Sequence, residues 1–162
     1  MGGVTLTIRR YQCADAAATA RVFRESVSRT AAASYEDRQI AAWLGRGNDV
    51  RRWNTRRLAA HTVVAETQGE VAGFSDLTRA GVLDMLYVHP DHAGQGVARA
   101  LVEEVLGEAR SRGLATVVVQ ASRAARPVLE RLGFVVDHEN PHNVVDGVCV
   151  PNFTMHADLE PC

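Results

Sequence analysis

One stretch of the sequence decides the fold: Leu83-Asp84-Met85-Leu86-Tyr87-Val88-His89-Pro90-Asp91-His92-Ala93-Gly94-Gln95-Gly96-Val97-Ala98-Arg99. Residues 82–88 predict a strand that Pro90 ends, and apolar residues at helical spacing from Val97 predict a long helix. The first N–H groups of a helix lack partners inside it and lie at the positive end of its dipole. Because glycine lets the backbone approach a ligand closely, Gly94 and Gly96 predict a pyrophosphate site at this helix start.

Three other interpretations of this loop are weaker or excluded. A tight turn alone also needs glycine. A dinucleotide-binding fingerprint would carry a third glycine and follow a βαβ unit, whereas here a hairpin series precedes the loop. A P-loop needs a lysine, and the chain contains none.

Outward from this stretch, the pattern predicts a single mixed domain over residues 1–162. We expect a first strand over 5–10, a helix from Asp15 to Val27 and a second helix after Ser34, capped by Ser34 with Asp37. Strands follow over 61–66, 71–77 and 82–88, then the long helix, a buried strand over 116–119 and a helix reaching Leu132. The tail, residues 134–159, predicts two strands around the Asp146-Gly147 turn signal. The order β-αα-βββ-α-β-α-ββ indicates an α/β (α+β) fold with a central sheet of about six to seven strands and about four helices.

Composition narrows the function classes. The net charge is −1, so the protein has no overall field that draws it to nucleic acid or to an anionic membrane. The basic segment 51–57 could form a nucleic-acid site, but Trp53 is its one aromatic residue, and we favour a solvated helix face. We expect no membrane span, no signal peptide and a cytoplasmic protein.

The cysteines and histidines predict neither disulfides nor a metal. Cys13, Cys149 and Cys162 are widely spaced and form no CxxC pair, and we expect Cys149 to be a buried structural thiol. His89 and His92 flank Pro90 in a loop rather than sharing a helix face, so we expect no metal site.

With these residues in view, the sequence resembles the Gcn5-related N-acetyltransferase (GNAT) family. The stretch 83–99 is similar to the family's motif A, and residues 121–134, which end in Leu132-Gly133-Phe134, are similar to its next helix. Tyr35, Gln39-Ile40-x-x-Trp43, Ala125-Arg126-Pro127 and Asn152-Phe153-x-Met155 further resemble the YafP-like subgroup. The resemblance covers nearly the whole chain.

The resemblance implies an acetyl-CoA-dependent N-acetyltransferase. Acetyl-CoA would lie in a V-shaped cleft where the fourth strand (82–88) splays from the fifth (116–119). Its pantetheine arm would pair with the backbone around Leu86, Tyr87 and Val88. Its phosphates would lie on Gly94, Gln95, Gly96, Val97, Ala98 and Arg99, with Arg126, and also Arg123 and Arg131, as candidates for the outer phosphates. The family also suggests a homodimer.

Two positions depart from the family pattern. Ala93 replaces the Gln or Arg that usually opens motif A, which matters little because backbone amides bind the phosphates. Leu129 replaces the Tyr that usually protonates the departing thiolate. Water or another hydroxyl, with Tyr87 as our candidate, would have to serve.

The implied reaction also needs a base, because an alkyl amine with a pKa near 10.4 is only about 0.1% neutral at pH 7.4. Asp84, on the strand expected to line the thioester, is our first choice and Glu66 our second; Asp84 could equally hold a neighbouring loop by hydrogen bonds.

We expect a small-molecule amine as acceptor, in a cavity walled by Tyr35, Trp43, Phe74 and Asn152, although such aromatics often belong to the core. The alternatives are a non-catalytic acyl-CoA-binding or sensor protein, which Leu129 favours, and a protein N-acetyltransferase, which would need an open groove.

Overall fold

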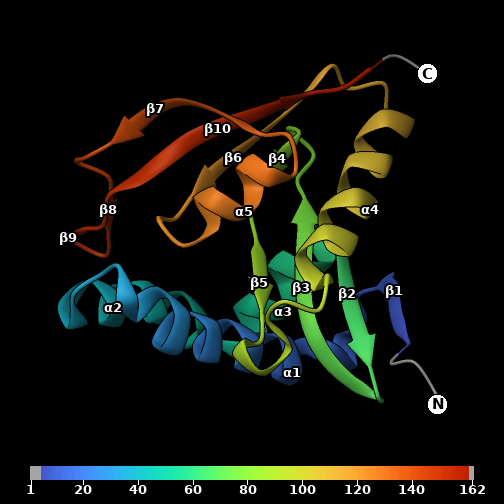
Figure 1. Ribbon diagram of the computed structural model, residues 1–162. Coiled ribbons are helices and arrows are strands. Elements are labelled where there is room, and N and C mark those ends of the chain that lie inside the picture. The colour runs from blue at the N-terminus through green and yellow to red at the C-terminus, as the bar shows by residue number, and fades with distance from the viewer. Residues whose placement is uncertain (1–4, 161–162) are drawn as a thin grey trace.

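The computed structural model describes residues 5–160. The helices are α1 (Ala16–Glu25), α2 (Asp37–Leu44), α3 (Val50–Ala59), α4 (Val97–Ser111) and α5 (Ala125–Arg131). The strands are β1 (Leu6–Arg10), β2 (His61–Thr67), β3 (Glu70–Leu77), β4 (Val82–Leu83), β5 (Leu86–Val88), β6 (Thr116–Ala121), β7 (Val135–Asn140), β8 (Val144–Val145), β9 (Val148–Cys149) and β10 (Asn152–Asp158). The predicted order of elements is confirmed, with α3 as a full helix and the β8–β9 hairpin as additions (Figure 1).

The sheet is split into two halves. One half has the strand order β1-β2-β3-β5 and is antiparallel, and the other has the order β4-β6-β10-β7, in which β4 and β6 run parallel. The strand predicted over 82–88 therefore contributes to both halves: β4 pairs with β6, whereas β5 pairs with β3. The predicted V-shaped splay between the strand over 82–88 and the strand over 116–119 is confirmed. It opens after Leu83, where β5 separates from β6.

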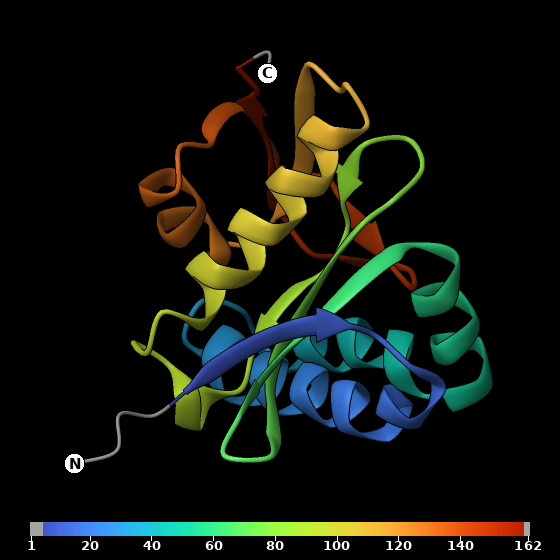
Figure 2. The same cartoon turned by 90° about the vertical axis from the view of Figure 1, so that its right-hand side faces the viewer.

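Two hydrophobic clusters cover the two faces of the sheet. On one face α4 packs on β2 and β3, and the cluster continues to α5 and the inner side of β6 and β10. On the other face α1, α2 and α3 enclose a cluster that contains Phe23, Trp53 and Phe74. Figure 2 shows the N-terminal helices together on one side and α4 with α5 on the other. None of the helices between residues 5 and 160 is long and apolar enough to cross a membrane.

The N-terminal helices refine three predictions. The first helix ends at Glu25 and continues as a wider turn over Ser26–Thr30. The capping box of α2 uses Glu36 with Gln39 rather than Ser34 with Asp37, because the chain before Glu36 is still coiled in short turns. The basic segment 51–57 is helical as predicted, but Arg57 is buried, so its solvated face is incomplete.

The C-terminal segment differs from the prediction in one respect. Asp146 and Gly147 both have positive φ, 48° and 75°, and form the predicted hairpin turn. The strands that it joins, however, are the short β8 and β9, which project between β7 and β10. The prediction that Cys149 is buried is wrong, because in this projecting hairpin its thiol is exposed and donates a hydrogen bond to the carbonyl oxygen of Pro141 (3.1 Å). Cys162 lies outside the described residues.

Gly73 sets how closely α4 approaches the sheet. A Cβ atom at this position would lie 2.8 Å from the carbonyl oxygen of Tyr87 and 2.9 Å from Cγ1 of Val97. We predict that Gly73→Ala destabilises the fold by about 1–3 kcal/mol through overpacking, lowering the melting temperature by roughly 2–4 °C per kcal/mol.

Gly107 provides the matched control for that measurement. It lies in the exposed interior of α4, and a Cβ there would meet no atom within 4 Å. Gly107→Ala should raise stability by about 0.5–1 kcal/mol. Equal melting temperatures for the Gly73→Ala variant and the wild type would show that the sheet and α4 can separate without cost.

Candidate functional site

The split between β4 and β5 is held open by one carboxylate. The Oδ1 atom of Asp76, on β3, accepts hydrogen bonds from the backbone N–H groups of Asp84 (3.0 Å) and Met85 (2.8 Å). These are the two residues between the strands, and their N–H groups would otherwise lack partners in a buried position. The Asp76 side chain thus replaces the missing part of the β-ladder and leaves the exposed side chain of Asp84 facing a cavity.

Asp76 in turn lies beside a buried arginine of α3. Nη2 of Arg57 is 3.8 Å from Oδ2 of Asp76, and both residues are at most 2% exposed. The Arg57 guanidinium also stacks on Trp53, 4.6 Å from the ring centroid. Burial raises the pKa of Asp76 to about 6 and lowers the pKa of Arg57. The attraction between the two side chains opposes both shifts, and the backbone N–H groups of Asp84 and Met85 oppose the shift of Asp76.

The far edge of β5 carries free backbone groups. His89 N–H donates to Ala72 O (2.8 Å) and Asp76 N–H donates to Met85 O (3.2 Å), so the odd-numbered residues of this strand point their backbone groups at β3. The groups of Leu86 and Val88 therefore point away from β3. Among the described strands none pairs with this edge of β5, so it offers a short template for an extended ligand.

The loop after β5 leads this edge to the N-terminus of α4. Gly94 and Gly96 have φ values of 75° and 81°, a region that residues with a side chain rarely adopt, and a Cβ on either would meet no protein atom within 4 Å. Because the bond from Ala100 N–H to Gly96 O is the first of the helix, the N–H groups of residues 97–99 point out of its end. The open space and the free donors fit a pyrophosphate, as the sequence predicted.

Arg126, a predicted phosphate ligand, lies on α5. Its guanidinium pairs with Glu130 on the same helix and stacks on Phe153, 4.6 Å from the ring centroid. Arg123, the other basic residue near the start of α5, donates to the carbonyl oxygen of Ser34 (2.9 Å). Both side chains would have to leave these contacts to reach a phosphate.

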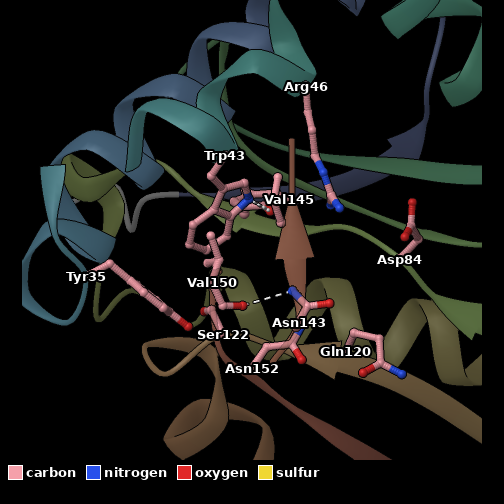
Figure 3. Close-up of a pocket in the computed structure, with 11 residues that line it drawn as sticks. Tyr35, Trp43, Arg46, Asp84, Gln120, Ser122, Asn143, Val145, Val150 and Asn152 are labelled. Atoms are coloured by element: carbon pink, nitrogen blue, oxygen red, sulfur yellow. Dashed lines mark hydrogen bonds between the residues drawn. The ribbon is translucent and has the colours of Figure 1, made fainter. Parts of the chain in front are cut away.

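On the opposite side of the split lies a cavity of about 160 Å³. Its walls contain five of the predicted residues: Tyr35, Trp43, Asp84 and Asn152, which Figure 3 labels, and Tyr87. The indole N–H of Trp43 donates to the Tyr87 hydroxyl oxygen (3.2 Å), which leaves the Tyr87 proton free to be donated elsewhere. Burial raises the pKa of Tyr87 to about 12, so this hydroxyl stays protonated at neutral pH.

Leu129 marks the narrow gap that joins the cavity to the split. It is 1% exposed and lines a space of about 50 Å³ together with Leu83, Leu86 and Ala125. The position on α5 at which the family pattern usually has a tyrosine is thus aliphatic. Tyr87 also lines this gap and supplies the one phenolic hydroxyl found there among residues 5–160.

Two predicted residues are not brought to the cavity. Glu66 is on β2 and pairs with Arg9, whose Nε lies 2.9 Å from Oε2 of Glu66. Phe74 is fully buried beneath Tyr87, with ring centroids 5.7 Å apart, and belongs to the core instead of the wall. The sequence offered no sign of this, because alternate residues of β3 face opposite sides and both sides are covered.

Sequence reasoning also missed several cavity residues: Arg46, Gln120, Ser122 and Asn143. Arg46 has a recognisable signal, since it lies between two glycines where α2 ends. Gln120 and Ser122 flank Ala121 at the end of β6, the parallel neighbour of the split strand, where ligand-binding side chains gather in such sheets. Asn143 lies in the connection to the projecting hairpin and offered no pattern.

The fold and this geometry agree with a comparison to known families. The sequence profile of the acetyltransferase (GNAT) domain matches residues 31–157. The chain belongs to the GNAT family of acetyltransferases. Its relatives are named N-acetyltransferases or acyltransferases, and we therefore describe it as a GNAT enzyme.

Two relatives from Escherichia coli K12 span most of this GNAT enzyme. YafP, an uncharacterized N-acetyltransferase, is 31% identical over 129 residues, which cover 80% of this chain and 81% of YafP. The L-amino acid N-acyltransferase MnaT is 32% identical over 148 residues, which cover 84% of this chain and 83% of MnaT. The expected similarity to the YafP-like subgroup is thereby confirmed.

Solved structures show the same fold. A GCN5-related N-acetyltransferase from Rhodopseudomonas palustris superposes with a TM-score of 0.92 at 32% identity, covering 98% of this chain and 99% of that one. YncA of Salmonella typhimurium, solved with its cofactor acetyl-CoA, has a TM-score of 0.71 at 26% identity, covering 98% and 96%.

The buried Asp76 gives the stability of this GNAT enzyme a defined pH dependence. Its pKa rises from about 3.9 in the unfolded chain to about 6 in the folded one, so the folded state binds more protons in between. The stabilising contribution of this group is complete below about pH 4 and is lost as the pH rises through 6. We predict that the stability advantage of the wild type over Asp76→Asn shrinks from pH 4 to pH 6.5.

Denaturant unfolding of both proteins across this range measures the effect. The difference between them is needed because other carboxylates titrate as well: Arg9 lowers the pKa of Asp15, which changes stability in the opposite direction. An advantage that grows with pH would mean that Arg57 and the two backbone N–H groups outweigh burial.

Proposed function

We propose that this GNAT enzyme transfers the acetyl group of acetyl-CoA to the amine of a small-molecule acceptor. The observation that carries the proposal is the split at Asp84. On one side it exposes the edge of β5 leading to the free N–H groups of α4, and on the other it exposes a cavity lined by a carboxylate and a protonated hydroxyl. YncA, with its bound acetyl-CoA, supports the choice of donor.

The residues present fit the donor. The outward backbone groups of Leu86 and Val88 can pair with the amides of a pantetheine arm, and the loop at Gly94–Gly96 can receive the pyrophosphate. Bound acetyl-CoA supplies a thioester carbon that an amine can attack. The gap beside Leu129, between β4, β5 and β6, would hold the thioester because it joins the two sides of the split.

Asp84 is the proposed general base. Its carboxylate is exposed to the cavity, and its backbone is fixed by Asp76, so it can take one proton from the acceptor ammonium, directly or through a water. The nitrogen lone pair then forms the C–N bond to the acetyl carbon while the C–S bond breaks, and the nitrogen loses its second proton to water as the amide forms. The proton on Asp84 leaves to solvent.

Tyr87 is the proposed general acid in place of the family tyrosine. Its hydroxyl accepts a hydrogen bond from Trp43, so its own proton can be given to the departing sulfur. The high pKa of Tyr87 makes the protonated form dominant, and solvent would return the proton after each turnover. A thiolate is a fairly good leaving group, so this step contributes less than deprotonation of the amine.

The acceptor cavity favours a small molecule over a protein. The β8–β9 hairpin and the residues after it contribute Val145 and Val150 to one wall. This wall is fastened by the hydrogen bond from Gln39 Nε2 to Cys149 O (3.0 Å) and that from Tyr35 Oη to Pro151 O (2.6 Å). The name of MnaT, an L-amino acid N-acyltransferase, points to acceptors of similar size. A single observation, the aliphatic Leu129, favours a second candidate: a protein that binds acetyl-CoA without turnover.

The donor is tested by thermal unfolding with acetyl-CoA. Acetyl-CoA at 100 times its Kd should stabilise the wild type by about 2.7 kcal/mol. Gly96→Ala should lose much of this shift, because alanine disfavours φ of 81° and its methyl group would enter the space meant for phosphate. Gly107→Ala should keep the full shift. Equal shifts for all three proteins would place the donor elsewhere.

The base is tested by thiol release with a panel of small amines. Asp84→Asn should lower kcat by about 10²- to 10⁴-fold, the range expected for loss of a general base. Its stabilisation by acetyl-CoA should not change. Asp37→Asn, on the exposed first turn of α2, is the control and should keep full activity. Turnover unchanged in Asp84→Asn would assign the base to another group, and no turnover by the wild type would favour the acetyl-CoA-binding protein.

A further inference from the structure

A second and larger hollow continues from the acceptor cavity. It encloses about 650 Å³ and shares Arg46, Asp84 and Val145 with the cavity of about 160 Å³. The hollow lies between the end of α2, the start of α3, the split at Asp84 and the β8–β9 hairpin. Figure 3 shows the Arg46 side chain reaching down toward Asp84, and both residues line both spaces.

Size indicates that an acceptor uses both spaces. Sites for small molecules generally enclose about 300–1,000 Å³, and the inner cavity alone falls below this range. An amine held at Asp84 therefore fills the inner cavity with its nitrogen end. The remainder of the molecule has room in the outer hollow.

Three arginines line that hollow, together with three aspartates and Asn48. Arg46 comes from the turn after α2, and Arg52 and Arg56 lie one helical turn apart on the same face of α3. We call this outer space the arginine vestibule, defined by Arg46, Arg52 and Arg56. None of the three guanidinium groups forms an ion pair with a carboxylate of residues 5–160.

Three aspartates share the vestibule with the arginines. Asp49 caps α3, with its Oδ1 accepting from Arg52 N–H (3.1 Å). Asp84 faces the inner cavity, where it would meet the amine. Asp146 lies in the hairpin turn and also lines the hollow, with its Oδ2 3.9 Å from the position of a Cβ on Gly45. Because none of these carboxylates forms an ion pair with Arg46, Arg52 or Arg56, the guanidinium groups can still contact an anion. Arginine binds carboxylate and phosphate in two-pronged geometry.

We propose that the arginine vestibule is a subsite for an anionic group of the acceptor, a carboxylate or a phosphate, several bonds from the reacting nitrogen. The acceptor class is then an amine with a distal negative charge, whose nitrogen lies at Asp84 and whose anion lies at Arg52 and Arg56. Arg46, at the junction, can bind an anionic group next to the amine. This inference rests on the proposed function for its amine and extends it to the rest of the molecule.

Binding to the CoA-saturated protein tests the inference independently of turnover. The probes are two matched pairs, L-glutamate with L-glutamine and O-phospho-L-serine with L-serine, titrated calorimetrically. Within at least one pair the anionic member should bind tenfold or more tightly, and the pair that shows this tells carboxylate from phosphate. The preference should shrink in high salt, as expected for exposed charges.

Substitutions identify which arginines cause the preference for the anionic compound. Arg52→Gln combined with Arg56→Gln should remove it by weakening the anionic member about tenfold, while the neutral member binds as before. Arg51→Gln, on the same helix but outside the vestibule, is the control and should keep it. Equal binding within both pairs, or a preference that survives the double change, would overturn the inference.

Thiol release on the same compounds separates this inference from the proposed function. Discrimination in binding without any thiol release would contradict the N-acetyltransferase proposal and leave the anion subsite standing. Thiol release that is equally fast for charged and neutral members, with no discrimination in binding, would contradict the anion subsite and leave the N-acetyltransferase proposal standing.

Discussion

The hydrogen bonds from two backbone N–H groups to the buried Asp76 carboxylate are the constraint on which this site depends. They allow one strand to leave the sheet at Asp84 without leaving buried polar groups unpaired. Without such an acceptor, strand 82–88 would gain most by pairing along its whole length, which would close the split. The pairing of β4 with β6 and of β5 with β3 is thus tied to one side chain on β3.

That carboxylate is itself kept in place by α3. Arg57 lies between Asp76 and Trp53, and all three are buried. Some of their polar atoms, among them Nε and Nη1 of Arg57, have no hydrogen-bond partner within residues 5–160. A buried ion pair of this kind adds little net stability, because desolvation offsets attraction. Its contribution is to geometry: it ties the N-terminal helices to the strand that carries Asp84.

Much of the fold could be predicted from the sequence because its signals are local. The glycine loop, the apolar stripe of α4 and the turn at Asp146-Gly147 each show their conformation within a few residues. The resemblance to the family then supplied the splay of the sheet. The capping residue of α2 was missed because Ser34 and Glu36 offer overlapping patterns two residues apart.

The cavity was harder to predict because its residues meet only in three dimensions. Tyr35, Trp43 and Asn152 were anticipated, whereas Phe74 fits the same aromatic description and lies in the core. In the sequence, segment 51–57 is simply rich in arginine, yet Arg57 faces Asp76 and Arg52 faces the vestibule. Which side of a helix is buried depends on distant partners, and nothing within the segment distinguishes them.

The hydrogen bonds along the cavity wall have a consequence for how the protein folds. Two hydrogen bonds fasten the C-terminal wall of the cavity. They join Gln39 to Cys149 and Tyr35 to Pro151, residues 110 and 116 positions apart. Contacts of such separation form slowly, because a long loop must close first. The β5–α4 unit, by contrast, is continuous in sequence from Leu86 to Ser111. During folding, the half that receives the donor should therefore take shape before the half that receives the acceptor.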